Sequence, residues 1–172
     1  MKRTKTPLQE KLMTAHDIQK DIAKWKLKGL SICFTNGCFD ILHLGHITYL
    51  SKAALLADVL IVGVNSDRSV KALNKAPDRP VNNEEARAAL IASLEAVDAV
   101  FVFDENTPKE LISKLLPDVL VKGGDYDPEE QDSGHPRYVV GRESVLKSGG
   151  SVKTIELVEG FSTTEILKKI QS

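Results

Sequence analysis

The chain has 172 residues, of which 42% are hydrophobic and 27% charged, and its net charge is −1 at pH 7. This length suits one domain with a sizeable core. The near-zero charge provides no field that would recruit nucleic acid or an anionic membrane, and no apolar run approaches the roughly 20 residues of a membrane span. The basic N-terminus has no apolar stretch behind it, so we expect no secretory signal and a cytoplasmic protein.

The N-terminal 29 residues form the first predicted region, an extension followed by a helix. The first dozen residues are polar and are expected to be loose. A helical stripe follows, formed by Ala15, Ile18, Ile22, Trp25 and Leu27, and Gly29 closes it as a C-terminal cap. We expect a second region, residues 30–172, to be the main domain.

Apolar strands and helices alternate through this second region. Strands are predicted at 30–34, 59–64, 99–103, 119–121 and 152–157. Helices are predicted at 44–57, 82–94 with Asn82 or Asn83 as cap, from Pro108 with Thr107 as cap, at 144–147, and through residue 170 with Ser162 or Thr163 as cap. The alternation predicts an α/β fold, a single doubly wound Rossmann-like domain with a five-stranded parallel sheet.

Polar segments follow several of the predicted strands. Ligands of such sheets bind at the carboxyl ends of the strands, so we expect a site there. The segments are ThrAsnGly at 35–37, AsnSerAsp at 65–67, LysGlyGlyAsp at 122–125 and GlyPheSerThrThr at 160–164.

His43 and His46 lie three residues apart at the predicted start of a helix, with Gly45 between them. Residues at this spacing share a helix face, and a helix N-terminus attracts anions, phosphate above all. Glycine leaves the backbone open to a close ligand. Zinc binding is the weaker alternative, because zinc needs a third ligand and no HisGluXaaXaaHis pattern is present. A structural role as helix cap or surface residues is the other alternative.

The HisLeuGlyHis segment resembles the HxGH signature of the nucleotidyltransferase superfamily. The surrounding FTNGCFDILHLGHITYL is similar to the branch that acts on small sugar and alcohol phosphates. Five further segments are similar to adenylyltransferases of heptose 1-phosphate, so the resemblance covers roughly residues 30–170: VGVNSDRSVKAL, RPVNNEEARAALIASLEAVDAV, FDENTPKELI, PDVLVKGGDY and VEGFSTTEILKKI. Many such domains are fused to a sugar kinase, whereas here we expect a standalone domain, and the stretch 132–141 is longer than in the fused forms.

The resemblance implies that AMP is transferred from ATP to D-glycero-D-manno-heptose 1-phosphate. The products would be pyrophosphate and ADP-heptose, a precursor of lipopolysaccharide or another surface polysaccharide. The attacking phosphate oxygen is already anionic, so no general base is expected. Catalysis would come from positioning and charge neutralisation. Mg²⁺ is expected to enter with ATP, and no metal-binding side chains are predicted.

The resemblance also assigns roles to individual residues. His43, His46 and Lys122 are the expected catalytic residues. Asp40 would hold either its own loop or a ligand, and Lys75 and Arg79 would belong to a mobile basic loop between residues 65 and 80 that closes over phosphates. Any one lysine there is also readily explained as a surface charge. The remaining expected nucleotide-binding residues are Thr35, Asn36, Gly37, Gly45, Gly123, Asp125, Ser162 and Thr163. Arg87 is expected to pair with Glu84 or Glu85.

Two other functions are compatible with the sequence. The first is a CTP-dependent cytidylyltransferase for glycerol 3-phosphate or another polyol phosphate, because sequence does not reveal the base. The second is a non-catalytic nucleotide-binding module, which the presence of both histidines, Lys122 and the SerThrThr segment makes the weaker choice. The expected partners are ATP and a sugar 1-phosphate, without nucleic acid or membrane. A homodimer or higher homo-oligomer is expected, with the helix at 17–27 as one available contact.

Overall fold

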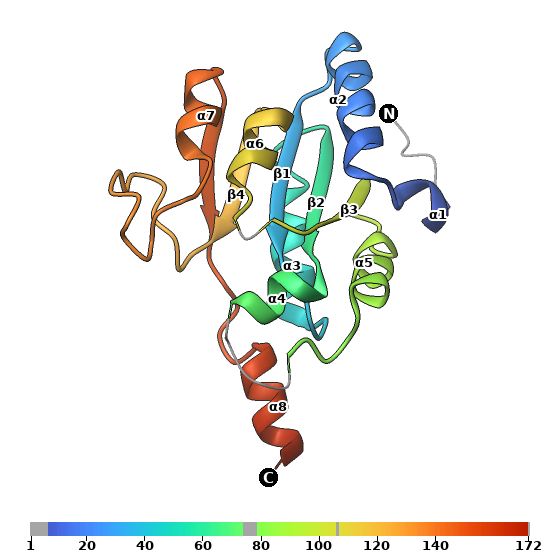
Figure 1. Ribbon diagram of the computed structural model, residues 1–172, viewed down its shortest axis with the longest axis vertical. Coiled ribbons are helices and arrows are strands. Elements are labelled where there is room, and N and C mark those ends of the chain that lie inside the picture. The colour runs from blue at the N-terminus through green and yellow to red at the C-terminus, as the bar shows by residue number, and fades with distance from the viewer. Residues whose placement is uncertain (1–6, 74–78, 106, 172) are drawn as a thin grey trace.

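The computed structural model describes residues 7–73, 79–105 and 107–171, and it contains a five-stranded sheet with all neighbouring strands parallel (Figure 1). The strands are β1 (Ile32–Gly37), β2 (Val59–Asn65), β3 (Ala99–Phe103), β4 (Val119–Gly123) and β5 (Ser151–Ile155). Their order across the sheet is β3-β2-β1-β4-β5. The chain therefore reverses its winding between β1 and β4, which makes this pair the topological switch point.

Helices cover both faces of the sheet, which confirms the doubly wound prediction. They are α1 (Leu8–Lys11), α2 (Ala15–Leu27), α3 (Leu44–Ala53), α4 (Asp67–Ala72), α5 (Glu84–Ala92), α6 (Lys109–Leu115), α7 (Arg142–Lys147) and α8 (Thr163–Gln171). Successive residues of β2 point to opposite faces, so Ile61 packs in the core with α2, α6 and α7, whereas Leu60 and Val62 pack in the core with α3 and α5.

The strand boundaries near the expected site differ from the prediction. β1 continues through Thr35 and Asn36 to Gly37, because these residues pair with Val62 to Val64 of β2. β4 likewise extends to Gly123, whereas β5 ends at Ile155. The ThrAsnGly segment is thus the end of the strand rather than a segment that follows it, and its side chains take fixed alternating directions.

The prediction that residues 65–80 form a loop is wrong for the first part of this range. Ser66 caps a short helix there, α4, because its hydroxyl accepts a hydrogen bond from the Ser69 amide at 3.0 Å. Lys75 lies outside the described residues.

Asn83 is confirmed as the cap of α5, since its side chain accepts a hydrogen bond from the Ala86 amide at 2.8 Å. Thr107 is not the cap of α6: Pro108 occupies the cap position and the helix starts at Lys109.

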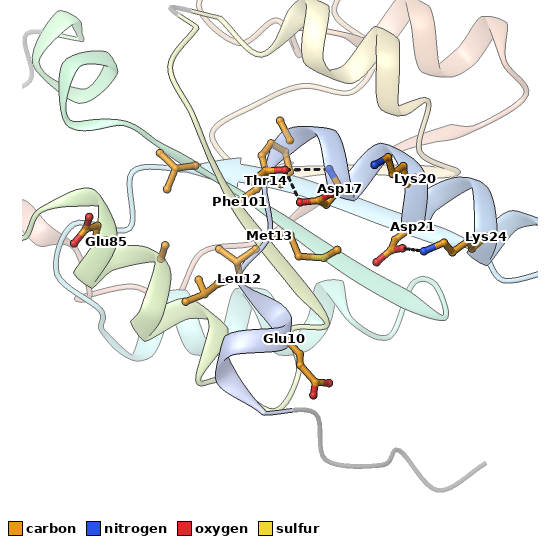
Figure 2. A pocket seen from close by; sticks show the side chains of 14 residues that line it. Glu10, Leu12, Met13, Thr14, Asp17, Lys20, Asp21, Lys24, Glu85 and Phe101 are labelled. Carbon is orange, nitrogen blue, oxygen red and sulfur yellow. Dashed lines mark hydrogen bonds and ion pairs between the residues drawn. The ribbon is translucent and has the colours of Figure 1, made fainter.

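The N-terminal segment packs along the edge of the sheet. Ile18 and Ile22 of α2 are buried in the core, and Leu12 bridges to Val100 of the edge strand β3. Part of the segment expected to be loose is therefore ordered, with α1 at its start. It borders a shallow cavity of about 970 Å³ in which Thr14 and Asp17 hydrogen-bond to each other (Figure 2). None of the described residues assigned to the predicted site lines this cavity.

Candidate active site

A second cavity, of about 750 Å³, lies at the carboxyl ends of the central strands. It receives residues from the ends of β1 and β4 and from the starts of α3 and α8, as expected for a switch-point site. The structure brings most of the predicted residues together in its lining: Asn36, Gly37, Asp40, His43, Gly45, His46, Arg79, Lys122, Gly123, Asp125, Ser162 and Thr163.

The two histidines stack face to face at the start of α3. Their ring centroids are 3.7 Å apart with an interplanar angle of 19°. His43 is the N-cap of the helix, and its Nδ1 accepts a long hydrogen bond of 3.4 Å from the His46 amide. Phe39, whose φ of 48° is left-handed, sets its ring edge-on to His46 at 5.2 Å. The rings are therefore held in place before any ligand binds.

Burial and the neighbouring His43 lower the pKa of His46 to about 4, and burial also lowers the pKa of His43. His46 is therefore neutral at pH 7. Its Nδ1 is buried and has no hydrogen-bond partner among the described residues. This nitrogen is enclosed by protein atoms, so it is not itself accessible to a ligand in the cavity. Among the described residues, no group of three or more His, Cys, Asp or Glu side chains is arranged to hold a metal ion.

Gly45 is required by the close packing around it. A Cβ at this position would lie 3.0 Å from two atoms of the His43 ring and 3.3 Å from the Phe161 carbonyl oxygen. The start of α3 thus lies directly against the segment that leads into α8. Two helix N-termini meet at the cavity as a result, and both present backbone N–H groups to it.

Lys122 crosses the switch point from β4 to β1. Its ammonium group donates a hydrogen bond to Oδ1 of Asn36 and lies 5.7 Å from the centroid of the Tyr126 ring. Burial lowers the pKa of Lys122 to about 8, although the nearby Asp125 carboxylate acts in the opposite direction. The lysine is a cation at neutral pH and has little hydration, which makes it a strong partner for a phosphate oxygen.

Asp40 holds the chain segment that carries Arg79. Its buried carboxylate accepts hydrogen bonds from Arg79 Nε at 2.9 Å, from the Val81 amide at 2.8 Å and from the Asn82 amide at 3.1 Å. Of the two roles considered for Asp40, this geometry favours holding the loop. Arg79 is consequently anchored at the cavity wall with its side chain 10% exposed.

The predicted partners of Arg87 are wrong. This fully buried side chain donates to the Asn82 carbonyl at 2.9 Å, to the Cys38 carbonyl at 2.6 Å and to the Asp67 carboxylate at 2.7 Å. Glu84 instead accepts from the Asp67 amide at 2.7 Å. Arg87 therefore ties the β1–α3 loop to the starts of α4 and α5, a long-range role that sequence spacing does not reveal.

Thr35 is the described residue of the predicted set that does not line the cavity. It is buried in β1, and its hydroxyl hydrogen-bonds to the Tyr49 hydroxyl at 2.7 Å. Tyr49 does reach the cavity, together with several residues that the sequence analysis did not assign to the site: Phe39, Asn65, Tyr126, Leu157 and Phe161. Asn65 and Phe161 lie within segments already singled out after strands, and Tyr126 directly follows another, whereas Phe39, Tyr49 and Leu157 lie in none of these segments.

The lining is better suited to phosphates than to a bare metal ion. Its carboxylates are Asp40, which is already bonded to the 79–82 segment, and Asp125. Mg²⁺ commonly binds through one or two carboxylates, water and the phosphates of its nucleotide. The residues present are compatible with an ion of this kind, with Asp125 as the carboxylate that would face it.

The sheet order, the switch-point cavity and the two helix starts that face it define a Rossmann-like α/β fold of the nucleotidyltransferase type. The chain belongs to the cytidylyltransferase-like family, whose model matches residues 34–169.

Relatives of known name support this assignment. The chain is 52% identical over 163 residues to the bifunctional protein HldE of Wolinella succinogenes, covering 95% of this chain and 32% of the relative. It is 48% identical over 161 residues to the bifunctional protein HldE of Haemophilus ducreyi, covering 94% of this chain and 32% of the relative. The chain thus spans about a third of the length of these relatives.

Two solved structures share the fold. The lipopolysaccharide core biosynthesis protein from Thermoplasma volcanium has a TM-score of 0.57 and 30% identity, over 76% of this chain and 98% of its own. Pantoate-beta-alanine ligase from Francisella tularensis has a TM-score of 0.57 at 16% identity, over 93% of this chain and 76% of its own, and shows the fold alone. No helix in the described part of the chain is long and apolar enough to cross a membrane.

Proposed function

We propose that the chain is a nucleotidyltransferase that transfers AMP from ATP to D-glycero-D-manno-heptose 1-phosphate. The products are ADP-heptose, which serves lipopolysaccharide or other surface polysaccharide synthesis, and pyrophosphate. The observation that carries the proposal is the stacked His43–His46 pair at the start of α3, facing the start of α8 and Lys122 across one cavity. The similarity to HldE and to a lipopolysaccharide core biosynthesis protein supports the choice of substrate.

The chemistry requires positioning and charge neutralisation rather than a base. An anionic oxygen of the sugar phosphate attacks the α-phosphorus of ATP, a new P–O bond forms, and the bond to the β-phosphate oxygen breaks as pyrophosphate leaves. No proton has to be removed from this nucleophile. His43 and His46 donate hydrogen bonds to the phosphate oxygens, while Lys122 and Arg79 offset their charge.

The two helix starts hold the polyphosphate between them. Backbone N–H groups at the start of α3 and at Ser162, Thr163 and Thr164 supply further donors, and Gly45 allows the two helix starts to lie against each other. A divalent ion, which we take to be Mg²⁺, neutralises phosphate charge when it enters with ATP. Because ATP is the donor, we place the reaction in the cytoplasm.

The test is pyrophosphate release with Mg²⁺ and a grid of substrates. ATP and CTP are each combined with both anomers of the heptose 1-phosphate and with glycerol 3-phosphate. We expect release with ATP and one heptose anomer, which also fixes the anomer.

The family's cytidylyltransferase-like character makes CTP with glycerol 3-phosphate the second candidate. Release with that pair would replace the proposed substrates but leave the mechanism in place. ATP binding without release in any pairing would contradict an enzymatic function and indicate a nucleotide-binding module.

A further inference from the structure

The cavity at the carboxyl ends of the strands receives side chains from both faces of the sheet. His43 and His46 reach it from α3, which packs on one face through Tyr49 and Leu50. The opposite face carries α6 and α7 and supplies a separate group of side chains to the same cavity, which we call the α6/α7 half: Asn36, Asn65, Lys122 and Tyr126. Tyr126 belongs to this half because it packs against the core of that face.

The direction of Asn36 and Lys122 follows from their strands. Phe34 of β1 and Leu120 of β4 lie in the core on the face of α6 and α7. Asn36 and Lys122 each follow one of these residues by two positions, so their side chains point to the same face. The hydrogen bond from the Lys122 ammonium to Oδ1 of Asn36 agrees with this direction.

Asn65 brings a second amide to the α6/α7 half from the end of β2. Val64, directly before it, packs in the core on the other face, so Asn65 points to the face of α6 and α7. The Asn65 side chain is almost fully buried, and its Nδ2 donates to the Ser69 hydroxyl at 2.9 Å. This bond holds the amide in place. Its Oδ1 receives no hydrogen bond from the described residues, so it is available as an acceptor to a ligand in the cavity.

The two amides together match the hydrogen bonding of hydroxyl groups. Asn36 uses its Oδ1 for Lys122, and its Nδ2 donates to none of the described residues, so its N–H donors are available. Asn65 offers the acceptor. A hydroxyl group both donates and accepts hydrogen bonds, and neither amide carries a charge that a sugar ring would have to neutralise.

The charge of the α6/α7 half suits a single phosphate group. Lys122 is its cation among the described lining residues, because Arg79, the other basic side chain of the lining, is bonded to Asp40 in the loop that leads into α3. A triphosphate would need more positive charge, and the histidines and the two helix starts provide suitable donors beside α3.

The spacing of the strands also fits a sugar phosphate. Lys122 and Asn65 lie on β4 and β2, with β1 and Asn36 between them. Neighbouring strands are about 4.8 Å apart, so β4 and β2 are about 10 Å apart. A sugar 1-phosphate can therefore place its phosphate at Lys122 and its ring beside the two amides.

We infer that the acceptor binds in the α6/α7 half, with its phosphate at Lys122 and its hydroxyl groups hydrogen-bonded to Asn36 and Asn65. The inference rests on the proposed function and names the residues that select the sugar. ATP then binds in the half beside α3. Asn36, which the sequence resemblance assigned to the nucleotide, is assigned to the acceptor instead, and Asn65 becomes a specificity-determining residue.

The first test compares the KM values for the two substrates. In Asn65→Leu we expect the KM for heptose 1-phosphate to rise by about tenfold or more, as for the loss of a buried hydrogen bond, and the KM for ATP to stay the same. Ser69→Ala is the matched control, because it removes the same internal hydrogen bond but leaves the amide in the cavity, which Ser69 does not line. Equal effects on both substrates, an unchanged KM for the sugar, or the same rise in Ser69→Ala would overturn the inference.

Failure of the proposed function would have a different signature. The unmodified chain would then release no pyrophosphate with ATP and either heptose anomer. If CTP and glycerol 3-phosphate are the active pair instead, the same comparison of KM values with that acceptor tests the α6/α7 half independently of the sugar.

Substrate analogues test the contact of Asn65 with a hydroxyl group directly. A series of heptose 1-phosphates, each lacking one hydroxyl group, is compared by kcat/KM. The unmodified chain should discriminate against one of them by about tenfold or more, because a site that hydrogen-bonds a hydroxyl rejects the analogue without it. Asn65→Leu should lose most of this discrimination, since the partner of that hydroxyl is gone. The same discrimination in both proteins against every analogue would contradict the contact.

Discussion

The two helices that begin at the cavity, α3 and α8, differ in how much of the chain supports them. α3 buries Tyr49, Leu50 and Ala53 against the sheet, and the loop before it is tied down by the buried side chains of Asp40 and Arg87. α8 has the Ser162 cap, and its described residues belong to neither hydrophobic core. The wall at α3 is therefore tied to the body of the chain by many buried contacts, whereas the wall at α8 has few. Preorganised donors cost nothing at the moment of reaction, which favours the α3 wall as the source of catalysis.

Removing the Arg87 side chain should disrupt the wall of the site at α3 and have the largest effect on stability. Arg87→Met leaves the Cys38 and Asn82 carbonyls without their donor and Asp67 without its ion pair. We expect the free energy of unfolding to fall by about 3–5 kcal/mol, as for the loss of one partner of a buried ion pair, measured by urea denaturation.

Arg68→Met is the control for this change. The Arg68–Asp104 pair is exposed, with 65% and 60% of the two side chains accessible, so its loss should lower the free energy of unfolding far less. An equal fall in the free energy of unfolding of the two variants would mean that Arg87 does not organise the wall of the site at α3.

Removing the His46 imidazole should leave the fold intact but slow turnover. His46→Ala deletes a donor that is held in place by His43 and Phe39, so we expect pyrophosphate release to fall by about 10²-fold. His16→Ala is the control, because His16 is exposed far from the cavity lining. Turnover close to that of the unmodified chain in a folded His46→Ala variant would remove the catalytic role from this residue.

Crowding the junction between the two helix starts should weaken nucleotide binding. In Gly45→Ala the added methyl group meets the His43 ring and the Phe161 carbonyl, a crowding that costs about 1–3 kcal/mol. Calorimetry with ATP should show weaker binding by about 5- to 150-fold, the equivalent range. Gly134→Ala, whose added carbon has an ordinary contact of 3.4 Å, is the control. Unchanged affinity in Gly45→Ala would show that phosphates do not bind at this junction.

Because Lys122 is buried, we expect the free energy of unfolding to depend weakly on pH. Its pKa is about 8 in the folded protein, below the ordinary value of 10.5, so between these values the unfolded chain binds more protons. The free energy of unfolding should then rise with pH, by about 1 kcal/mol over roughly the first pH unit above the folded pKa. Lys122→Met should remove this rise in urea titrations at several pH values. The same slope in both proteins would place the titration elsewhere.

Local patterns in the sequence were sufficient to predict the alternation of strands and helices, because apolar runs and caps such as Asn83 are local features. They also placed the HisLeuGlyHis segment correctly at the start of a helix. The sheet order, the ion pair of Arg87 with Asp67 and the contact of Gly45 with Phe161 join residues far apart in the chain, so no local pattern predicts them. The helix α4 was missed because its six residues are too few for a clear periodicity.

The central claim is that ATP binds at the stacked histidines, and NMR tests it most directly. The chain has four histidines, and His16 and His135 lie outside the cavity lining. Titration of ATP with Mg²⁺ into histidine-labelled protein should shift the imidazole signals of His43 and His46 together, with one dissociation constant, and leave the other two unchanged. Saturable ATP binding that leaves the His43 and His46 signals in place would contradict the account.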